Sequence, residues 1–224
     1  MQQIAFENNL AETAFFLRKG ERFDLRWFTP VVEVDLCGHA TLASAFVLFT
    51  QLGWIEPSVE FESRSGLLSV NHRNSVLELD FPARPAAAEI PPTALLEGLG
   101  VSAREVLKAR DWMVVLESEE EVRGLQPNFE ALAKCGAMVI VTAPGRDVDF
   151  VSRFFAPTVG ISEDPVTGSA HCTLIPYWAS RLGKTKLQAR QLSARGGEIF
   201  CELRGDRVGI GGHAVLYSSG TLHV

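Results

Sequence analysis

The sequence predicts a mixed α/β (α+β) protein made of two pseudo-symmetric halves. Segments with the alternating pattern of β-strands occur along most of the chain. Two apolar segments of helical length, 38–52 and 168–182, each begin at a glycine and are followed by another glycine. The residues that precede the first helix are repeated before the second. With 224 residues, of which 46% are hydrophobic, the chain can bury a sizeable core.

Composition and charge limit the kinds of molecule that the protein is expected to bind and the compartment in which it is expected to occur. The formal net charge of −6 gives no basic field, which argues against nucleic acid and acidic membranes as partners. The four cysteines, Cys37, Cys135, Cys172 and Cys201, are scattered without a CxxC pair, and this pattern favours free thiols in a reducing compartment. The first ten residues lack the basic and apolar regions of a signal peptide, and no apolar run approaches the ~18–20 residues of a membrane span. We therefore expect a cytoplasmic globular protein.

In the first half, polarity and alternation predict short elements around one buried helix. The expected elements are a helix over 1–9, strands over 13–19 and 22–28 joined by Gly20, the helix 38–52 ended by Gly53, and a strand meander over 58–82 with turns at Ser65–Gly66 and Arg73–Asn74. The Pro- and Ala-rich stretch "PARPAAAEIPP" (82–92) follows and is typical of a linker. It separates a first domain, 1–85, from a second, 91–213.

The second half follows a similar plan. The expected elements are short helices around 93–98 and 128–134, strands over 112–117, 137–142 and 149–155, the helix 168–182, and a strand-like tail broken at "RGG", "RGD" and "GIGG". Arg26 and Arg153 lie at matching points of two strands, where they are expected to brace the fold.

An internal repeat relates the two halves. When "LRWFTPVVEV" (25–34) is set over "SRFFAPTVGI" (152–161), an arginine, a phenylalanine, a proline and a valine coincide. After three inserted residues, taken as "EDP", Gly38 coincides with Gly168, and the helices that follow match at an alanine and at a closing Leu-Gly. These identities in two blocks predict a duplicated unit. The insertion would place Asp164 in the turn before the helix 168–182, with no counterpart in the turn before the helix 38–52.

The repeated unit predicts an anion site. The first N–H groups of a helix have no partner within it, and the helix dipole favours a negative charge there. A glycine at this point lets a ligand approach the backbone. Two such helix starts facing each other, at Gly38–His39 and Gly168–Ser169, would bind a small acid from both sides.

Three motifs carry a resemblance that spans nearly the whole chain: "NNLAETAFFL" (8–17), "FTPVVEVDLCGHATLASA" (28–45) and "RFFAPTVGISEDPVTGSAHC" (153–172). They resemble the PhzF-like family of phenazine-biosynthesis isomerases. The resemblance implies a diaminopimelate-epimerase-like fold, in which two domains each wrap a curved sheet around a central helix and the active site lies in the cleft between them. It also implies a homodimer, and a final strand within 214–224 that rejoins the first domain.

The same resemblance implies a cofactor-independent isomerase that acts on a small carboxylic acid without a metal. The family's general acid/base glutamate falls on Glu12, and its supporting residues fall on His39, Asp164 and Ser169. Gly38, Gly168 and Thr167 are expected to bind the substrate. Family members normally begin with a strand and a Gly-Asn-Pro turn that this sequence lacks, so part of the cleft is expected to be missing.

The residues alone leave other interpretations open. Glu12 could be a solvated or capping acid, Asp164 could cap a turn, Ser169 is favoured at a helix start anyway, and His39 could be satisfied by backbone. Two further functions compete with the isomerase: a non-catalytic or protein-binding relative, and a thiol-dependent racemase using Cys37. No phosphate-loop, serine-hydrolase or metal-ligand spacing is present.

Overall fold

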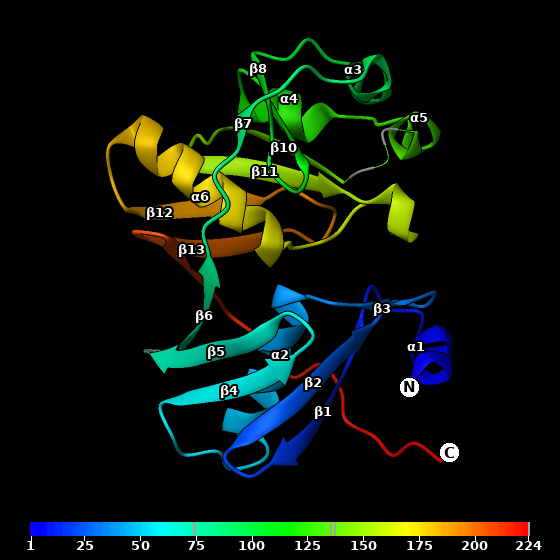
Figure 1. Cartoon of the computed structure of the whole chain (residues 1–224), viewed down its shortest axis with the longest axis vertical. Helices are drawn as coiled ribbons and strands as arrows, with labels where there is room; N and C mark the ends of the chain where they lie inside the picture. The colour runs from blue at the N-terminus through cyan, green and yellow to red at the C-terminus, as the bar shows by residue number, and fades with distance from the viewer. Residues whose placement is uncertain (74, 135, 137, 224) are drawn as a thin grey trace.

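Two lobes lie one above the other in the computed structural model, which describes residues 1–223 except 74, 135 and 137 (Figure 1). The N-terminal lobe contains α1 (Gln2–Asn8), β1 (Thr13–Lys19), β2 (Arg22–Phe28), β3 (Glu33–Val34), α2 (Gly38–Thr50), β4 (Ser58–Ser63), β5 (Gly66–Arg73) and β6 (Val76–Pro82). The C-terminal lobe contains β7 (Ala87–Ala88), α3 (Thr93–Leu99), β8 (Glu105–Lys108), β9 (Trp112–Val115), α4 (Glu119–Gly124), α5 (Phe129–Ala133), β10 (Val139–Pro144), β11 (Phe150–Phe155), a 3₁₀ turn (Pro157–Val159), α6 (Gly168–Leu182), β12 (Lys186–Gln191), β13 (Gly197–Arg204) and β14 (Arg207–Gly212). The predicted α/β class is confirmed.

A single hydrogen-bonded sheet runs through both lobes, in the order β1-β2-β4-β5-β6-β14-β13-β12-β11-β10-β9-β8-β7. The expectation of two separate sheets, one in each domain, is therefore wrong. The junction is an antiparallel ladder between β6 and β14, in which Phe81 faces Val208 and Leu79 faces Ile210. The "GIGG" segment, expected to break the tail, lies inside β14 because its glycines make room for neighbours: a Cβ on Gly211 would meet Val76 at 3.0 Å and Phe200 at 3.3 Å. The predicted domain limits stay a prediction.

Each lobe has one long helix packed on the sheet. Helix α2 contacts β1, β5 and β6, while α6 contacts β12, β13 and β14. One hydrophobic core cluster includes residues from both helices and both lobes, and a second fills the space under α3, α4 and α5. Two polar residues of α2, Thr41 and Ser44, are buried in this core. Their hydroxyls donate to the Cys37 and Ala40 carbonyls at 2.6 and 2.8 Å, so their burial leaves no hydroxyl without a hydrogen bond.

A proline within α6 ties the connection between the lobes to that helix. Pro176 has no N–H, so the Cys172 carbonyl four residues earlier lacks its usual helical donor. The backbone N–H of Arg84, from the segment after β6, donates to this carbonyl at 2.8 Å. The Pro- and Ala-rich stretch is thus anchored at its first residues.

The duplication is visible in matching side-chain groups. Arg26 forms a two-pronged ion pair with Glu33, at 2.8 Å for both contacts, and stacks over Phe28 at 5.2 Å. Arg153 pairs with Glu163 at 2.7 and 2.9 Å and stacks over Phe155 at 5.0 Å. Both arginines brace the fold, as predicted.

These pairs also correct the alignment. Because Glu163 is the counterpart of Glu33, the three extra residues lie before Glu163, and "EDP" is not the insertion. Asp164 then corresponds to Val34, so the second half differs from the first by substitution at this point.

Several elements differ from the sequence expectation. Residues 213–223 lie beside the N-terminal lobe but form no strand, so the predicted final strand is absent, and Val215 and Tyr217 are 85% and 98% exposed there (Figure 1). Strand β8 and helix α4 were not predicted; α4 begins with three glutamates and is capped by Ser118, whose hydroxyl accepts from Glu121 N at 3.3 Å. The predicted turn at Arg73–Asn74 and the state of Cys135 fall partly or wholly outside the described residues. No helix within the described ranges has the length and apolarity to cross a membrane.

A buried histidine on α6 couples stability to pH. His171 is 0% exposed, and its Nδ1 lies 2.8 Å from the Thr167 carbonyl oxygen. Its Nε2 has no hydrogen-bond partner within the described residues. Burial lowers the pKa of His171 to about 4, so the imidazole stays neutral in the folded protein at pH values where it is protonated in the unfolded chain.

We predict that this histidine destabilises the protein on acidification. Above pH 6.5, the pKa of the histidine in the unfolded chain, His171 does not reduce the free energy of unfolding. As the pH falls from 6.5 to 4 it reduces that free energy progressively, because only the unfolded chain binds the proton in this range. Between pH 7 and 4.5 the free energy of unfolding of wild type should fall about 2–3 kcal/mol more than that of His171→Gln, measured by urea titration. The matched control, His72→Gln on the exposed side of β5, should follow wild type; equal slopes for all three proteins would contradict the assignment.

Candidate functional site

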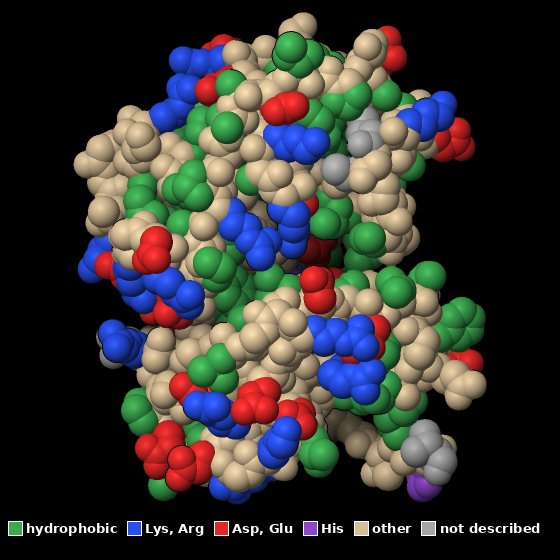
Figure 2. Space-filling model, in the orientation of Figure 1, with side chains coloured by type: hydrophobic (Ala, Val, Ile, Leu, Met, Phe, Trp, Pro, Cys, Tyr) green, Lys and Arg blue, Asp and Glu red, His purple; other side chains and the backbone are tan. Residues whose placement is uncertain are grey.

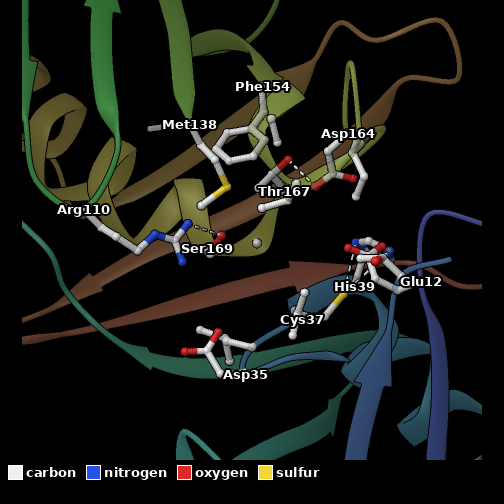
Figure 3. Close-up of a pocket in the computed structure, with 18 residues that line it drawn as sticks. Glu12, Asp35, Cys37, His39, Arg110, Met138, Phe154, Asp164, Thr167 and Ser169 are labelled. Carbon is white, nitrogen blue, oxygen red and sulfur yellow. Dashed lines mark hydrogen bonds and ion pairs between the residues drawn. The ribbon is translucent and has the colours of Figure 1, made fainter. Parts of the chain in front are cut away.

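A pocket of about 150 Å³ lies where the two lobes meet and is lined from both sides. Figure 2 shows the surface hollowed between the lobes, with both basic and acidic side chains around the hollow. All seven residues predicted for the site line the pocket: Glu12, Gly38, His39, Asp164, Thr167, Gly168 and Ser169 (Figure 3). The structure thus brings them together, while their roles stay predictions.

The starts of α2 and α6 converge at this pocket. A Cβ on Gly38 would lie 3.2 Å from the Gly168 Cα, and a Cβ on Gly168 would lie 3.3 Å from the Gly38 Cα. Neither helix receives a hydrogen bond from a capping side chain, although Cys37 and Thr167 occupy the cap positions. The N–H groups of the two first turns therefore receive no hydrogen bond from a capping side chain, which is the arrangement that the predicted anion site requires.

Glu12, His39 and Cys37 form a compact group on the N-terminal lobe. Glu12 directly precedes β1, and its Oε2 lies 3.1 Å from His39 Nε2, with side-chain exposures of 10% and 26%. This is an ion-pair distance, yet Oε2 makes no hydrogen bond to any described residue. The Cys37 Sγ lies 3.8 Å from both ring nitrogens of His39.

The charge state of this group follows from burial and from its acidic members. Burial lowers the pKa of His39, but Cys37, Glu12 and Asp164 outweigh it and hold that pKa well above its usual value. Burial raises the pKa of the Cys37 thiol, although His39 opposes the shift. The charges of Glu12 and Asp164 thus favour the imidazolium form of His39, and burial favours the neutral thiol form of Cys37.

Asp164 faces this group from the C-terminal lobe. Its Oδ2 accepts a hydrogen bond of 2.6 Å from the Thr167 hydroxyl, while its Oδ1 is buried without a hydrogen-bond partner among the described residues. Burial raises the pKa of the Asp164 carboxyl, and the nearby His39 and the Thr167 hydroxyl lower it less. The protonated form of Asp164 is therefore more accessible than that of a solvent-exposed aspartate.

Gln191 on β12 holds the turn that carries Asp164. Its amide oxygen accepts from Thr167 N at 2.8 Å, and its amide nitrogen donates to the Asp164 carbonyl at 2.6 Å and to the Thr167 hydroxyl at 3.0 Å. Sequence reasoning missed this residue. The signal was alternation: Leu187, Ala189 and Gln191 share the buried face of the strand, and a buried glutamine requires polar partners.

Arg110 was also missed, because no motif marks the turn between β8 and β9. Its guanidinium pairs with the buried Asp111 at 2.9 and 2.7 Å, and its Nη2 donates to the Ser169 hydroxyl at 3.0 Å. Asp35 lines the same pocket from the N-terminal lobe (Figure 3). Arg110 thus places a positive charge beside the start of α6.

The remaining walls are mostly apolar. They are formed by Val34, Leu36, Met138, Phe154, Ala156, Val159 and Ile161. Apolar walls lower the local dielectric constant, so the charges of Glu12, His39 and Arg110 act more strongly on a bound ligand than they would in water.

A family model described as "Phenazine biosynthesis-like protein" (PhzC-PhzF) matches residues 1–220. The chain belongs to this family. An uncharacterized isomerase of Pseudomonas aeruginosa is 56% identical over 227 residues, which cover 100% of this chain and 87% of the relative. The crystal structure of a PhzF family protein from Enterococcus faecalis has a TM-score of 0.96 at 47% identity and covers 100% of this chain and 86% of that one.

A more distant neighbour shows the fold alone. The structure of a probable proline racemase from Agrobacterium radiobacter has a TM-score of 0.62 at 12% identity, and the match covers 95% of this chain and 76% of that one. The PhzF-like resemblance read from the three sequence motifs and the epimerase-type fold that it implies are both confirmed.

The contact between the two helix starts gives a test by mutation. We predict that Gly38→Ala lowers the free energy of unfolding by about 1–3 kcal/mol, because the new methyl group would press on the Gly168 Cα at 3.2 Å and on Phe81 at 3.4 Å. Urea titration measures the loss. Gly124→Ala at the end of α4, where a Cβ meets open space, serves as the control and should be neutral or slightly stabilising. Equal stabilities of the two variants would mean that the helix starts are not in close contact.

Proposed function

We propose that the protein is a cofactor-independent isomerase or epimerase that moves a proton on a small carboxylic acid, with Glu12 as general acid/base. One observation carries the proposal: the Glu12 carboxylate, 10% exposed and ion-paired with His39, borders the pocket where two uncapped helix starts converge. The relatives named as isomerases support the same class of reaction.

The pocket suits a carboxylate substrate. The amides at Gly38–His39 and Gly168–Ser169 provide donors from two helix dipoles, and these favour an anion. The Arg110 guanidinium adds a full positive charge next to Ser169. We infer that the substrate carries its carboxylate at the helix starts and a second anionic or strongly accepting group toward Arg110.

Proton transfer then follows from the charge states. The Glu12 carboxylate removes a proton from a carbon of the bound acid, and the electron pair moves toward the substrate's carbonyl or conjugated system. The helix-start amides and the His39 imidazolium stabilise the negative charge that develops there. Stabilisation of this kind by fixed donors is usually the largest single contribution to the rate of such a step. Glu12 or the Asp164 carboxyl returns the proton at the new position, so the reaction is balanced without a further reactant.

The thiol alternative is less well supported by the same geometry. Burial raises the pKa of Cys37, which lowers the fraction of reactive thiolate. The equivalent position in the second half is Thr167, so a second thiol does not face the first. Alkylation with iodoacetamide should abolish the activity of a thiol racemase, whereas a glutamate base predicts little effect beyond the steric effect of the adduct. The cytoplasmic location and the homodimer remain proposals that rest on composition and on the resemblance.

We predict that Glu12→Gln loses roughly 10²–10⁴-fold in activity while the fold stays intact, since the amide keeps the shape and removes the base. Activity is read as deuterium incorporation from D₂O into a panel of small carboxylic acids, by mass spectrometry. Glu7→Gln, on the exposed side of α1, is the matched control and should retain wild-type exchange. Full exchange by folded Glu12→Gln would assign the base to another residue, whereas no exchange by wild type on any acid would favour the non-catalytic alternative.

A second prediction concerns substrate affinity. Asp111 is only 3% exposed, so removing Arg110 alone would leave a buried charge; the double variant Arg110→Gln/Asp111→Asn removes both charges. Loss of one charge-assisted hydrogen bond, worth about 1.5–3 kcal/mol, should raise KM by about 10- to 100-fold with a smaller change in kcat. Arg104→Gln/Glu117→Gln, an exposed pair near the same strands, is the control. An unchanged KM would show that Arg110 supports Ser169 without contacting substrate.

A further inference from the structure

The Glu12–Cys37–His39 group also has the composition of a metal site. A carboxylate oxygen, a thiol sulfur and an imidazole nitrogen from these residues all lie within 4.8 Å of one another. The individual separations, 3.1 Å from Glu12 Oε2 to His39 Nε2 and 3.8 Å from His39 Nε2 to Cys37 Sγ, are close to those between ligands that share one cation at 2.0–2.3 Å. The sequence shows no metal-ligand spacing, because Glu12 reaches the other two only through the fold.

A second observation points to a ligand at the same place. Glu12 Oε2 is buried and has no hydrogen-bond partner among the described residues, and the side chain is 10% exposed. Its contact with His39 Nε2 at 3.1 Å is an ion pair without a hydrogen bond, and a cation coordinated by both groups would replace that pair. Cys37 is itself 6% exposed, so its sulfur lies in the same dry environment.

We propose that Glu12, Cys37 and His39 bind a thiophilic divalent cation of the Zn²⁺ type, which leaves a fourth coordination position open toward the pocket. The three-ligand set with one open position is that of accessible zinc sites, and the sulfur and nitrogen ligands select against Mg²⁺ and Ca²⁺, which prefer oxygen. Coordination requires the thiolate and the neutral imidazole, so protons leave Cys37 and His39 on binding.

A cation at this site opposes the proposed proton transfer. It occupies the Glu12 carboxylate and neutralises the general base, and its open position competes for the substrate's acid group. The inhibition part of the inference rests on the proposed function, whereas binding does not. Zn²⁺ would therefore act as a reversible inhibitor of the isomerase.

Cobalt substitution tests binding without an activity assay. Titration of the purified protein with Co²⁺ should produce a thiolate-to-cobalt charge-transfer band in the near ultraviolet, and Zn²⁺ should abolish it by displacement. Cys37→Ser should lose the band and bind Zn²⁺ at least 10-fold more weakly by calorimetry. Cys201→Ser, a buried cysteine on β13 outside the pocket, is the matched control and should keep the band. A missing band in wild type, a band retained by Cys37→Ser, or an equal effect of excess Mg²⁺ would overturn the proposal.

The D₂O exchange assay then separates the two proposals. Zn²⁺ should suppress exchange by wild type and a chelator should restore it, while whatever exchange folded Cys37→Ser retains should need at least 10-fold more Zn²⁺ for the same fractional inhibition. A cobalt band in a wild-type protein that exchanges no acid would leave the metal site standing and refute the proposed isomerase. Exchange that Zn²⁺ leaves unchanged at concentrations that displace Co²⁺ would refute the inhibitory role.

Discussion

The close approach of two helix starts at Gly38 and Gly168 is the constraint on which the site depends. It aligns the positive ends of two helix dipoles at one point, an arrangement that is unfavourable unless negative charge is present. Glu12 and Asp164 provide that charge from opposite lobes, and the Thr167 hydroxyl is used for Asp164 instead of capping α6. The polar residues of "EDPVTGSAHC" (163–172) therefore stabilise the contact between two helix starts, as well as the start of α6 itself.

The duplicated frame explains why the pocket is similar on both sides in shape but different in chemistry. Equivalent positions in the two halves have the same Arg, Phe and Glu residues, which form the ion pairs Arg26–Glu33 and Arg153–Glu163 that brace the fold. The residues that reach the pocket have diverged, with His39 opposite Ser169 and Cys37 opposite Thr167. One lobe consequently holds the imidazolium, and the other holds the hydroxyls and Arg110, an asymmetry suited to a substrate whose two ends differ.

The sequence predicted best what depends on local pattern. Helix α6 and strands β1 and β2 have the expected bounds, and the site residues at Gly38–His39 and Gly168–Ser169 converge because the repeat places a glycine at both helix starts. The continuous sheet could not be predicted, since the glycines of β14 resemble a turn until Val76 and Phe200 are seen to fill the space beside Gly211. Arg110 and Gln191 were missed for a related reason: both reach the pocket through tertiary contacts, Arg110 at Ser169, 59 residues away, and Gln191 at Asp164, 27 residues away.

The attachments between the lobes suit a pocket that exists before a ligand arrives. Among the described residues, the contacts that join them include the β6–β14 ladder, the Arg84 N–H on the carbonyl freed by Pro176, and the packing of Gly38 on Gly168. Because the proposed base, Glu12, belongs to one lobe and Ser169 and Asp164 to the other, any rotation between lobes would change the distance between that base and the proposed anion site. Fixed donors stabilise a developing charge only if they need not reorganise as it forms. The continuous hydrogen-bonded sheet through both lobes therefore does more than join them, since it opposes rotations that would separate the proposed base from the proposed anion site.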